Sequence, residues 1–226
     1  MIMGGMTVEL YVLVFKAGNE YRRKMIRKIL CDHGFRELAA NVFIWDKLNL
    51  EKQLIENIRK TLNYYDSRYL FLRKGSQLIL IKYAFSKRNS KNYMNVKRLL
   101  ERIIALQISR GTYILLAKNS YIISELYKNV GYLEYFYLDP ISKIDEKQLS
   151  EMYVEYVSNI LDRLMAKKMT IRNRREALEL LRNIRLLQEG VMELSHANII
   201  DQISVISILK KLGSFKLEIL KKLQDL

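Results

Sequence analysis

The spacing of apolar residues divides the chain into an α/β part and a helical part. Residues 9–15 form a nearly continuous apolar run, which predicts a buried strand. Asn19 caps a basic amphipathic helix that ends at Gly34. Further β-rich runs predict strands, of which the last two are joined through Lys74–Ser76 as a hairpin. The remaining expected elements of this segment are strands at residues 35–39, 41–45, 68–73 and 77–84, and a helix at residues 50–62.

A second α/β segment follows the first. Residues 92–108 predict a helix, residues 113–116 a strand, residues 121–128 a helix and residues 132–138 a strand. Together with the preceding strand this gives β-α-β-α-β. The pattern fits either a second ferredoxin-like half or a small parallel α/β layer, packed against the first segment.

After Pro140 the pattern becomes helical throughout. Gly190 and Gly213 are interpreted as helix stops. The expected helices cover residues 145–165, 171–189, 198–212 and 214–224. The predicted architecture is therefore α/β (α+β), with three regions: a ferredoxin-like domain at 1–85, a second α/β segment at 86–140, and a helical bundle at 141–226.

Charge and aromatic residues are concentrated before the helical region. Residues 1–138 hold 24 Lys and Arg against 11 Asp and Glu, whereas residues 139–226 hold 15 against 13. Thirteen of the fifteen tyrosines also precede Asp139. Cations combined with planar rings suit a nucleic acid, DNA or RNA. The alternative interpretation is a lysine-rich surface with tyrosines that simply fill strands.

Composition narrows the other possibilities. One Cys and two His exclude an internal disulfide and make a cysteine or histidine metal site improbable. No apolar run approaches the ~20 residues that a membrane span needs, and residues 1–6 lack a signal-peptide pattern. We therefore expect a cytoplasmic protein that contacts no membrane and carries no cofactor. Few His and Cys with abundant Lys, Ile and Tyr are typical of a thermophile.

Four short motifs suggest a family. Leu13-Val-Phe-Lys16, Arg22-Arg23 leading into Ile29-Leu30, His33-Gly34-Phe35-Arg36 and Asn41-Val42-Phe43-Ile44 resemble the small subunit of the CRISPR spacer-integration complex, the Cas-two family. The resemblance covers residues 8–84. It implies a ferredoxin-like fold, a dimer, and an Asp at the end of the first strand that is associated with metal-dependent phosphodiester cleavage.

Lys16 occupies that strand-end position in this chain. A lysine would repel the hard cation that carboxylate oxygens bind, so we expect nucleic-acid binding without catalysis. Lys16, beside Gly18 and the start of a helix, could instead contact a phosphate. The nearest acids in sequence, Asp32 and Asp46, leave a degenerate nuclease as an alternative.

The candidate nucleic-acid-binding residues are all basic. They lie at the first strand and helix, in the connector at residues 86–91, and at the start of a C-terminal helix: Lys16, Arg22, Arg23, Arg27, Lys87, Arg88, Lys91, Arg172, Arg174 and Arg175. A rival function is a dimeric scaffold whose C-terminal helices recruit a protein partner. Salt-dependent binding separates the two, because affinity that depends on phosphate neutralisation falls with ionic strength.

Overall fold

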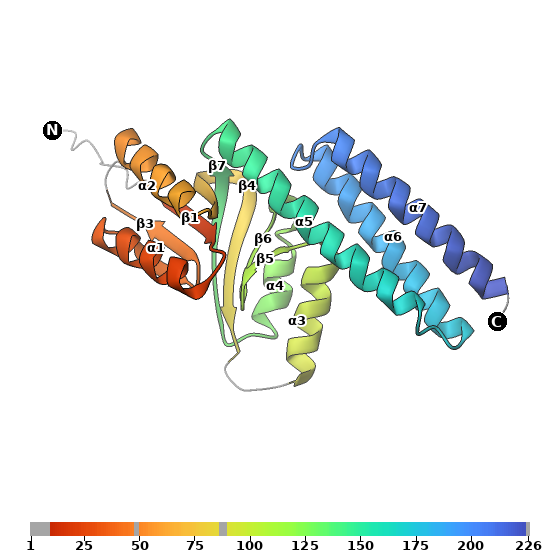
Figure 1. Ribbon diagram of the computed structural model, residues 1–226. Coiled ribbons are helices and arrows are strands. Elements are labelled where there is room, and N and C mark those ends of the chain that lie inside the picture. The colour runs from red at the N-terminus through yellow and green to blue at the C-terminus, as the bar shows by residue number, and fades with distance from the viewer. Residues whose placement is uncertain (1–9, 48–49, 86–89, 225–226) are drawn as a thin grey trace. The chain divides into compact units, whose positions relative to one another are not determined.

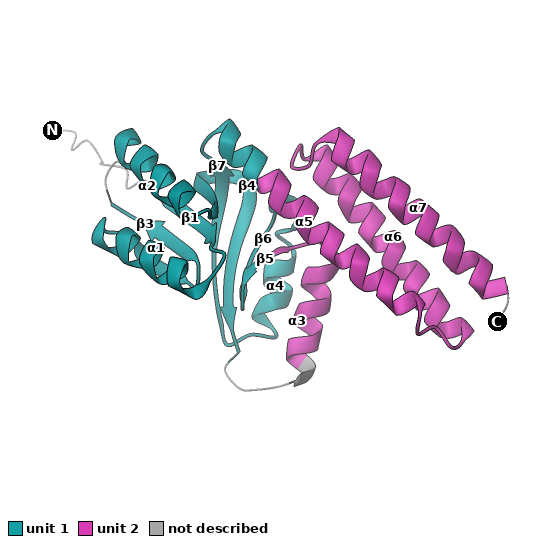
Figure 2. Cartoon of the chain, in the orientation of Figure 1, with its two compact units in different colours: residues 1–88, 107–148 teal, residues 89–106, 149–226 magenta. Residues whose placement is uncertain are grey.

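The computed structural model describes residues 10–47, 50–85 and 90–224 (Figure 1). The chain divides into two compact units (Figure 2): the first comprises residues 1–88 and 107–148, the second residues 89–106 and 149–226. Both units are therefore discontinuous in sequence. Among the described residues, no helix is long and apolar enough to cross a bilayer. The expected mixed α/β architecture with a helical C-terminal region is confirmed.

The α/β part consists of two consecutive β-α-β-β-α-β repeats that share one long strand. The first repeat, residues 11–73, ends in the first part of that strand, β4, and the second repeat, residues 77–140, begins in its second part. The first repeat contains β1 (Tyr11–Lys16), α1 (Glu20–Asp32), β2 (Arg36–Ala39), β3 (Val42–Trp45), α2 (Lys52–Tyr64) and part of β4 (Arg68–Ala84). The second adds α3 (Ser90–Arg102), β5 (Leu106–Ser109), β6 (Thr112–Leu116), the 3-10 turn η1 (Ala117–Asn119), α4 (Ile122–Tyr127) and β7 (Tyr132–Pro140).

The sheet gives each repeat the ferredoxin-like strand order. The main path is β2-β3-β1-β4-β6-β5, and β7 pairs with β4 in addition. Leu72 pairs with both β1 and β7, and Leu78 pairs with both β6 and β7. Strand β7 therefore follows one edge of β4, while β1 and β6 share the other edge. The orders β4-β1-β3-β2 and β7-β4-β6-β5 are equivalent, which supports the second ferredoxin-like half over the parallel layer.

The strand registers of the two repeats also correspond. Leu13 of β1 pairs with Phe43 and Phe71, and Ile81 of β4 pairs in the same way with Tyr113 and Tyr135. In each repeat the N–H of the third residue after the first helix donates to the carbonyl five residues back, from Phe35 to Leu30 and from Ala105 to Leu100, each at 3.0 Å. Phe71 and Tyr135 therefore hold equivalent places in the two repeats.

Backbone conformation repeats as well. Gly34 has φ +91° where α1 ends, and Ile104 has φ +50° at the equivalent place after α3. Asn41 and Gly111, which join the two short strands of each repeat, have φ +67° and +74°. The predicted helix at 92–108 is therefore wrong in its last part, because Ile104 turns the chain into β5. Isoleucine is strained in this left-handed region and is not a usual residue at a helix end. The local sequence therefore did not indicate that the helix ends here.

The predicted hairpin at Lys74–Ser76 is also wrong, since β4 is one 17-residue strand. Its pairing with β7 shifts register between Lys74 and Leu78. Asp139 of β7 fills that irregularity: its Oδ1 accepts the N–H of Ser76 at 2.8 Å and of Gln77 at 2.7 Å. A Cβ at Gly75 would overlap the Asp139 carboxyl group. The carboxylate thus satisfies two amides at the junction of the repeats.

One face of the first-repeat sheet packs against α1 and α2 (Figure 1). Leu13, Phe15 and Phe71 meet Ile26 of α1 and Ile58 of α2 in one buried cluster. The strand residues of opposite parity are buried too: Val12, Val14, Leu70 and Leu72 are at most 1% exposed. Both faces of β1 are therefore covered.

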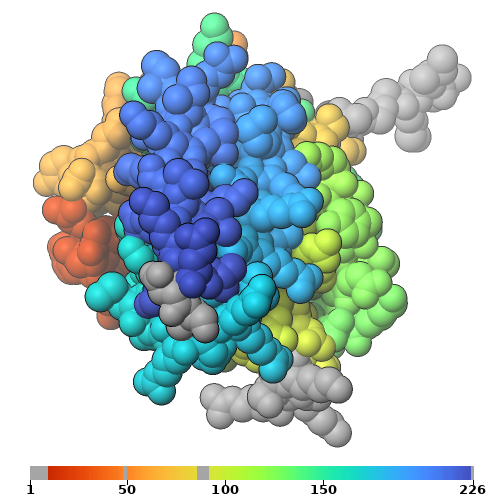
Figure 3. Space-filling model, turned by 90° about the vertical axis from the view of Figure 1, so that its right-hand side faces the viewer, coloured from red at the N-terminus to blue at the C-terminus, as the bar shows by residue number. Residues whose placement is uncertain are grey.

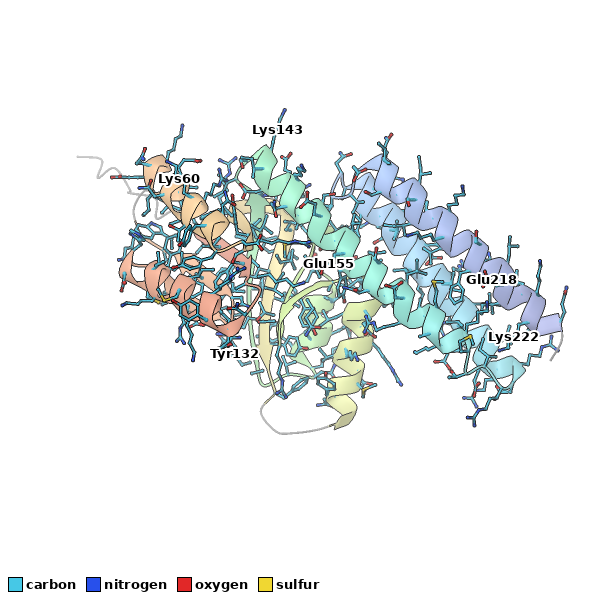
Figure 4. The ribbon with its side chains drawn as sticks, in the orientation of Figure 1. Lys60, Tyr132, Lys143, Glu155, Glu218 and Lys222 are labelled. Carbon is cyan, nitrogen blue, oxygen red and sulfur yellow. The ribbon has the colours of Figure 1, made fainter. Side chains whose placement is uncertain are left out.

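The second unit contains the long helices α5 (Lys143–Lys168), of which residues 143–148 belong to the first unit, α6 (Arg174–His196) and α7 (Gln202–Gln224). Helices α6 and α7 lie side by side (Figure 3). Lys168 pairs with Glu218, and Lys222 Nζ donates to the Lys168 carbonyl at 3.1 Å, which satisfies a carbonyl at the end of α5 (Figure 4).

The two glycines predicted to stop helices do not do so. Helix α6 continues past Gly190, where a Cβ would overlap Ile104 Cδ1, and the glycine therefore allows a close approach of that side chain. Helix α7 runs through Gly213, where a Cβ would meet nothing. Helices 198–212 and 214–224 are thus one helix, held by tertiary packing despite the glycine.

Candidate nucleic-acid interface

Three cationic residues gather at one end of the first repeat. Lys16 and Arg68 are cross-strand partners at the ends of β1 and β4, and both are exposed. Arg22 Nη1 lies 3.5 Å from the place a Cβ of Gly18 would occupy, in the turn between β1 and α1. We call Lys16, Arg22 and Arg68 the basic end. Positive charges side by side on adjacent strand ends attract an anion.

Sequence reasoning identified Lys16 and Arg22 but missed Arg68. The register of β1 against β4 alone places Arg68 opposite Lys16, and nothing in the local sequence around Arg68 indicates this pairing. Arg22 also contacts an acid, with Nη1 3.6 Å from Asp66 Oδ2. Asp66 is almost fully solvated while Arg22 is half-buried, so the interaction is weak and a stronger anion can compete for Arg22.

The start of α1 is already capped. Asn19 Oδ1 accepts the Arg22 N–H at 2.9 Å, and the Asn19 carbonyl accepts the Arg23 N–H at 3.1 Å. These two amides are therefore engaged within the protein. A phosphate at this end would be held by the cationic side chains rather than by those two N–H groups.

The other two predicted residues of α1 pair with acids. Arg23 pairs with Glu20, and Arg27 Nη2 lies 2.8 Å from Glu37 Oε2. Both pairs are exposed, which makes each worth little. Helix α1 therefore remains basic, but two of its arginines already pair with carboxylates of the protein.

The remaining predicted residues fall into two groups. Lys87, Arg88 and the side chain of Lys91 lie outside the described residues. Arg172, Arg174 and Arg175 are exposed around the start of α6, in the second unit. The local fold there is a reciprocal cap: Asn173 Oδ1 accepts the Glu176 N–H at 3.0 Å, and Glu176 Oε2 accepts the Arg172 N–H at 2.8 Å. The three arginines thus surround a structural cap.

Asp32 and Asp46, the two acids considered for a nuclease, do not belong to any cluster of metal-binding side chains among the described residues. Asp46 Oδ2 lies 3.3 Å from Arg36 Nη2, and Asp32 is exposed at the last position of α1. Within residues 10–47, 50–85 and 90–224, no group of three His, Cys, Asp or Glu side chains is arranged to hold a metal ion.

Exposed tyrosines are the second feature of the first unit. Five of them come from α4, which contacts β7, from the residue before α4, and from β7 itself. Tyr132 begins β7 (Figure 4), and Lys82 Nζ lies 5.7 Å from its ring centroid. Its hydrogen bond to Glu134 raises the pKa of the Tyr132 hydroxyl, because the phenolate would face a carboxylate. These five are Tyr121, Tyr127, Tyr132, Tyr135 and Tyr137, and Tyr21 of α1 and Tyr64 of α2 are exposed as well.

Comparison with known protein families finds no family that matches this sequence. No curated protein matches it either.

Proposed function

We propose that this chain is a non-catalytic nucleic-acid-binding protein whose basic end contacts phosphates. The observation that carries the proposal is the pairing of Lys16 with Arg68 across β1 and β4. The pairing holds two exposed positive charges at adjacent strand ends, where both can contact phosphates of one bound polyanion.

The charge of the first unit supports the same ligand. Residues 1–88 and 107–148 carry 22 Lys and Arg against 13 Asp and Glu, a balance of +9. A positive field of this kind attracts a polyanion over several ångströms and accelerates its association. The ferredoxin-like first repeat also agrees with the proposed kinship to the Cas-two family. With Lys16 at the strand end, that kinship suggests binding without cleavage.

Salt titrations test the proposal. Labelled single- and double-stranded DNA and RNA are titrated by fluorescence anisotropy over ~50–300 mM salt, with wild type, Lys16→Ala and Arg68→Ala. Each substitution should weaken binding and lower the salt slope by about one unit. Lys60→Ala is the matched control, because Lys60 is an exposed cation on α2 of the same unit (Figure 4).

A second readout uses the free protein. Melting temperatures of the Lys16 and Arg68 variants show whether a loss of affinity comes from unfolding rather than from the removed charge. Absence of binding at 50 mM salt would overturn the proposal. So would an equal loss of affinity in Lys60→Ala, because general charge rather than the basic end would then explain binding.

A second candidate function, protein docking, is favoured by α7. Four apolar side chains of this helix are exposed, and the helix also carries several lysines. The four are Ile203, Ile206, Leu217 and Leu220. The flanking Lys210, Lys211 and Lys221 disfavour a second copy of α7 and favour an acidic amphipathic helix as the partner. Binding of a designed Glu-rich heptad peptide to wild type, and its loss in Ile206→Glu, would support this function; no binding would exclude such a partner.

Dimerisation and a cytoplasmic location stay predictions from the sequence. Because both faces of β1 are buried in the chain itself, a dimer interface would lie on another surface. Light scattering decides between a 26.9 kDa monomer and twice that mass.

A further inference from the structure

The second repeat differs from the first in the length of one helix. Helix α2 has 13 residues, whereas its counterpart α4 has six. In the first repeat, Ile55, Ile58 and Leu62 of α2 belong to the buried cluster that contains Phe71. A shorter helix covers less of the strand beside it, so the equivalent part of β7 is expected to be open.

Exposure at the equivalent residues agrees with this expectation. Phe71 is 0% exposed, while Tyr135, which holds the same register position, is 39% exposed and Tyr137 is 40% exposed. The second repeat thus has aromatic side chains in open positions where the first repeat has core. Tyrosine suits such a place, because its ring is apolar and its hydroxyl is solvated.

Tyr135 and Tyr137 are two positions apart on β7, so their side chains share one face of the sheet. Their ring centroids are 6.1 Å apart and their planes meet at 81°, which leaves each ring a face that the other does not cover. The exposed Arg73 pairs with Asp139, two positions beyond Tyr137 on that face. A cation therefore lies at the end of this row, which we define as Tyr135, Tyr137 and Arg73.

The spacing of the row suits an extended single strand. Residues two apart on a strand are separated by about 6.6 Å, roughly twice the ~3.4 Å rise of stacked nucleotides. Two neighbouring bases that are unstacked can therefore each meet one ring. Bases inside a duplex do not present their faces, so a duplex cannot use the row in this way.

We propose that Tyr135 and Tyr137 stack on two bases of a single-stranded nucleic acid, and that Arg73 contacts the adjoining phosphate. This inference rests on the proposed nucleic-acid binding and adds that the protein prefers single-stranded to double-stranded nucleic acid. Stacking is tolerant of sequence because every base has an aromatic face, so oligonucleotides of different sequence should bind comparably.

Tyrosine substitutions test the inference. Affinities for a 12-nucleotide poly-dT, a 12-nucleotide poly-dA and a 12-base-pair duplex are measured at one salt concentration. Tyr135→Ala/Tyr137→Ala should bind both single strands roughly tenfold or more weakly for each ring removed. Tyr135→Phe/Tyr137→Phe keeps the rings and should bind like wild type. Duplex affinity should be unchanged in both.

Matched controls separate stacking from a loss of folding. Tyr64 is 83% exposed on α2, so Tyr64→Ala removes a more solvated ring from the same unit and should leave affinity unchanged. Melting temperatures of all variants identify any that are unfolded, and the Phe variant keeps the test valid if the Ala variant is unstable. The salt slope should stay at the wild-type value in the Tyr135 and Tyr137 variants, since no phosphate contact is removed.

The outcomes distinguish this inference from the proposed function. If the basic-end variants lose affinity while Tyr135→Ala/Tyr137→Ala binds single strands normally, the stacking inference is overturned and nucleic-acid binding stands. Equal losses for single strand and duplex also overturn it. A change in mass by light scattering with unchanged oligonucleotide affinity would assign the row to a protein contact. If wild type binds no oligonucleotide at 50 mM salt, the proposed function itself fails.

Discussion

Arg59 of α2 donates from Nη2 to Asp145 Oδ2 over 2.6 Å, and both residues are buried. Asp145 uses its other oxygen to accept the Phe71 N–H at 3.0 Å, so one carboxylate ties α2 to β4. Ser142 donates to the same Oδ2. Arg59 also pairs through Nη1 with the exposed Glu56 at 3.1 Å, and the Arg59–Asp145 pair links elements distant in sequence.

Removing Asp145 should therefore destabilise the first unit strongly. Asp145→Ala leaves the buried Arg59 with only the exposed Glu56 as a partner and the Phe71 amide without its acceptor, which should lower the free energy of unfolding by about 3–5 kcal/mol. Urea denaturation measures the loss. The neighbouring, exposed Glu146 is the control, and Glu146→Ala should change stability by less than about 0.5 kcal/mol. Similar losses in both variants would contradict a specific role for the pair.

Two helical glycines should respond oppositely to alanine. Gly213→Ala adds a methyl group in open space and removes backbone freedom from the unfolded chain, so it should stabilise by roughly 0.5–1 kcal/mol. Gly190→Ala forces a Cβ into Ile104 and should destabilise by about 1–3 kcal/mol. Thermal melting of the two variants gives both signs. A gain in stability at Gly190 would show that α6 does not approach Ile104 as described.

Asp201 should make stability depend on pH in a defined direction. Its side chain caps α7, with Oδ2 accepting from Ser204 Oγ at 2.6 Å and Oδ1 from the Ser204 N–H at 2.9 Å. The Ser204 hydroxyl and then its amide lower the Asp201 pKa below its ordinary 3.8. The unfolded chain thus binds a proton at higher pH than the folded one. The stabilisation is present above pH 3.8 and is lost as pH falls through the lowered folded value.

Asp201→Ala tests this dependence. At pH 7 it should cost about 0.5–2 kcal/mol, the usual effect of losing an N-cap. The difference from wild type should narrow below pH 3.8, where the unfolded carboxylate takes up a proton, and should level off once the folded carboxylate is protonated as well. Guanidinium unfolding at pH 7, 5 and 3 measures it. A difference that stays constant to the lowest pH would mean that the charged form of Asp201 contributes nothing.

Asp139 gives a fourth prediction. Asp139→Ala leaves the N–H groups of Ser76 and Gln77 without their carboxylate acceptor and should destabilise by about 1–3 kcal/mol. Asp139→Asn keeps an acceptor oxygen and should lose less. Hydrogen exchange at the amides of Ser76 and Gln77 reports the local effect, which should be faster in the Ala variant. Unchanged exchange there would contradict the role given to this carboxylate.

Local pattern predicted most elements of the first repeat, because their boundaries carry local signals. Asn19 marks the start of α1, and Gly34 marks its end with a positive φ that glycine favours. The equivalent end of α3 has Ile104, which gives no such signal. The predicted helix therefore extends too far and includes most of β5. The second segment allowed either a ferredoxin-like half or a parallel layer, and only the strand pairing decides for the ferredoxin-like half.

Features that depend on distant residues could not be predicted. Lys74-Gly75-Ser76 has hairpin composition, but Asp139 accepts the amides that let β4 continue. For the candidate site, the sequence identified Lys16 and the basic α1. Arg68 and the openness of Tyr135 depend on strand pairing and on the length of α4, which no local pattern contains.

The sharing of β4 also has a consequence for how the protein unfolds. Loss of the second repeat would expose the buried Leu78–Ile81 part of a strand whose other part still belongs to the first. A half-folded chain would then carry an unpaired apolar edge, which is unstable in water and prone to join other chains. We therefore expect the sheets of both repeats to melt in one cooperative transition. Proteolytic cutting within β4 should release neither repeat as a stable fragment.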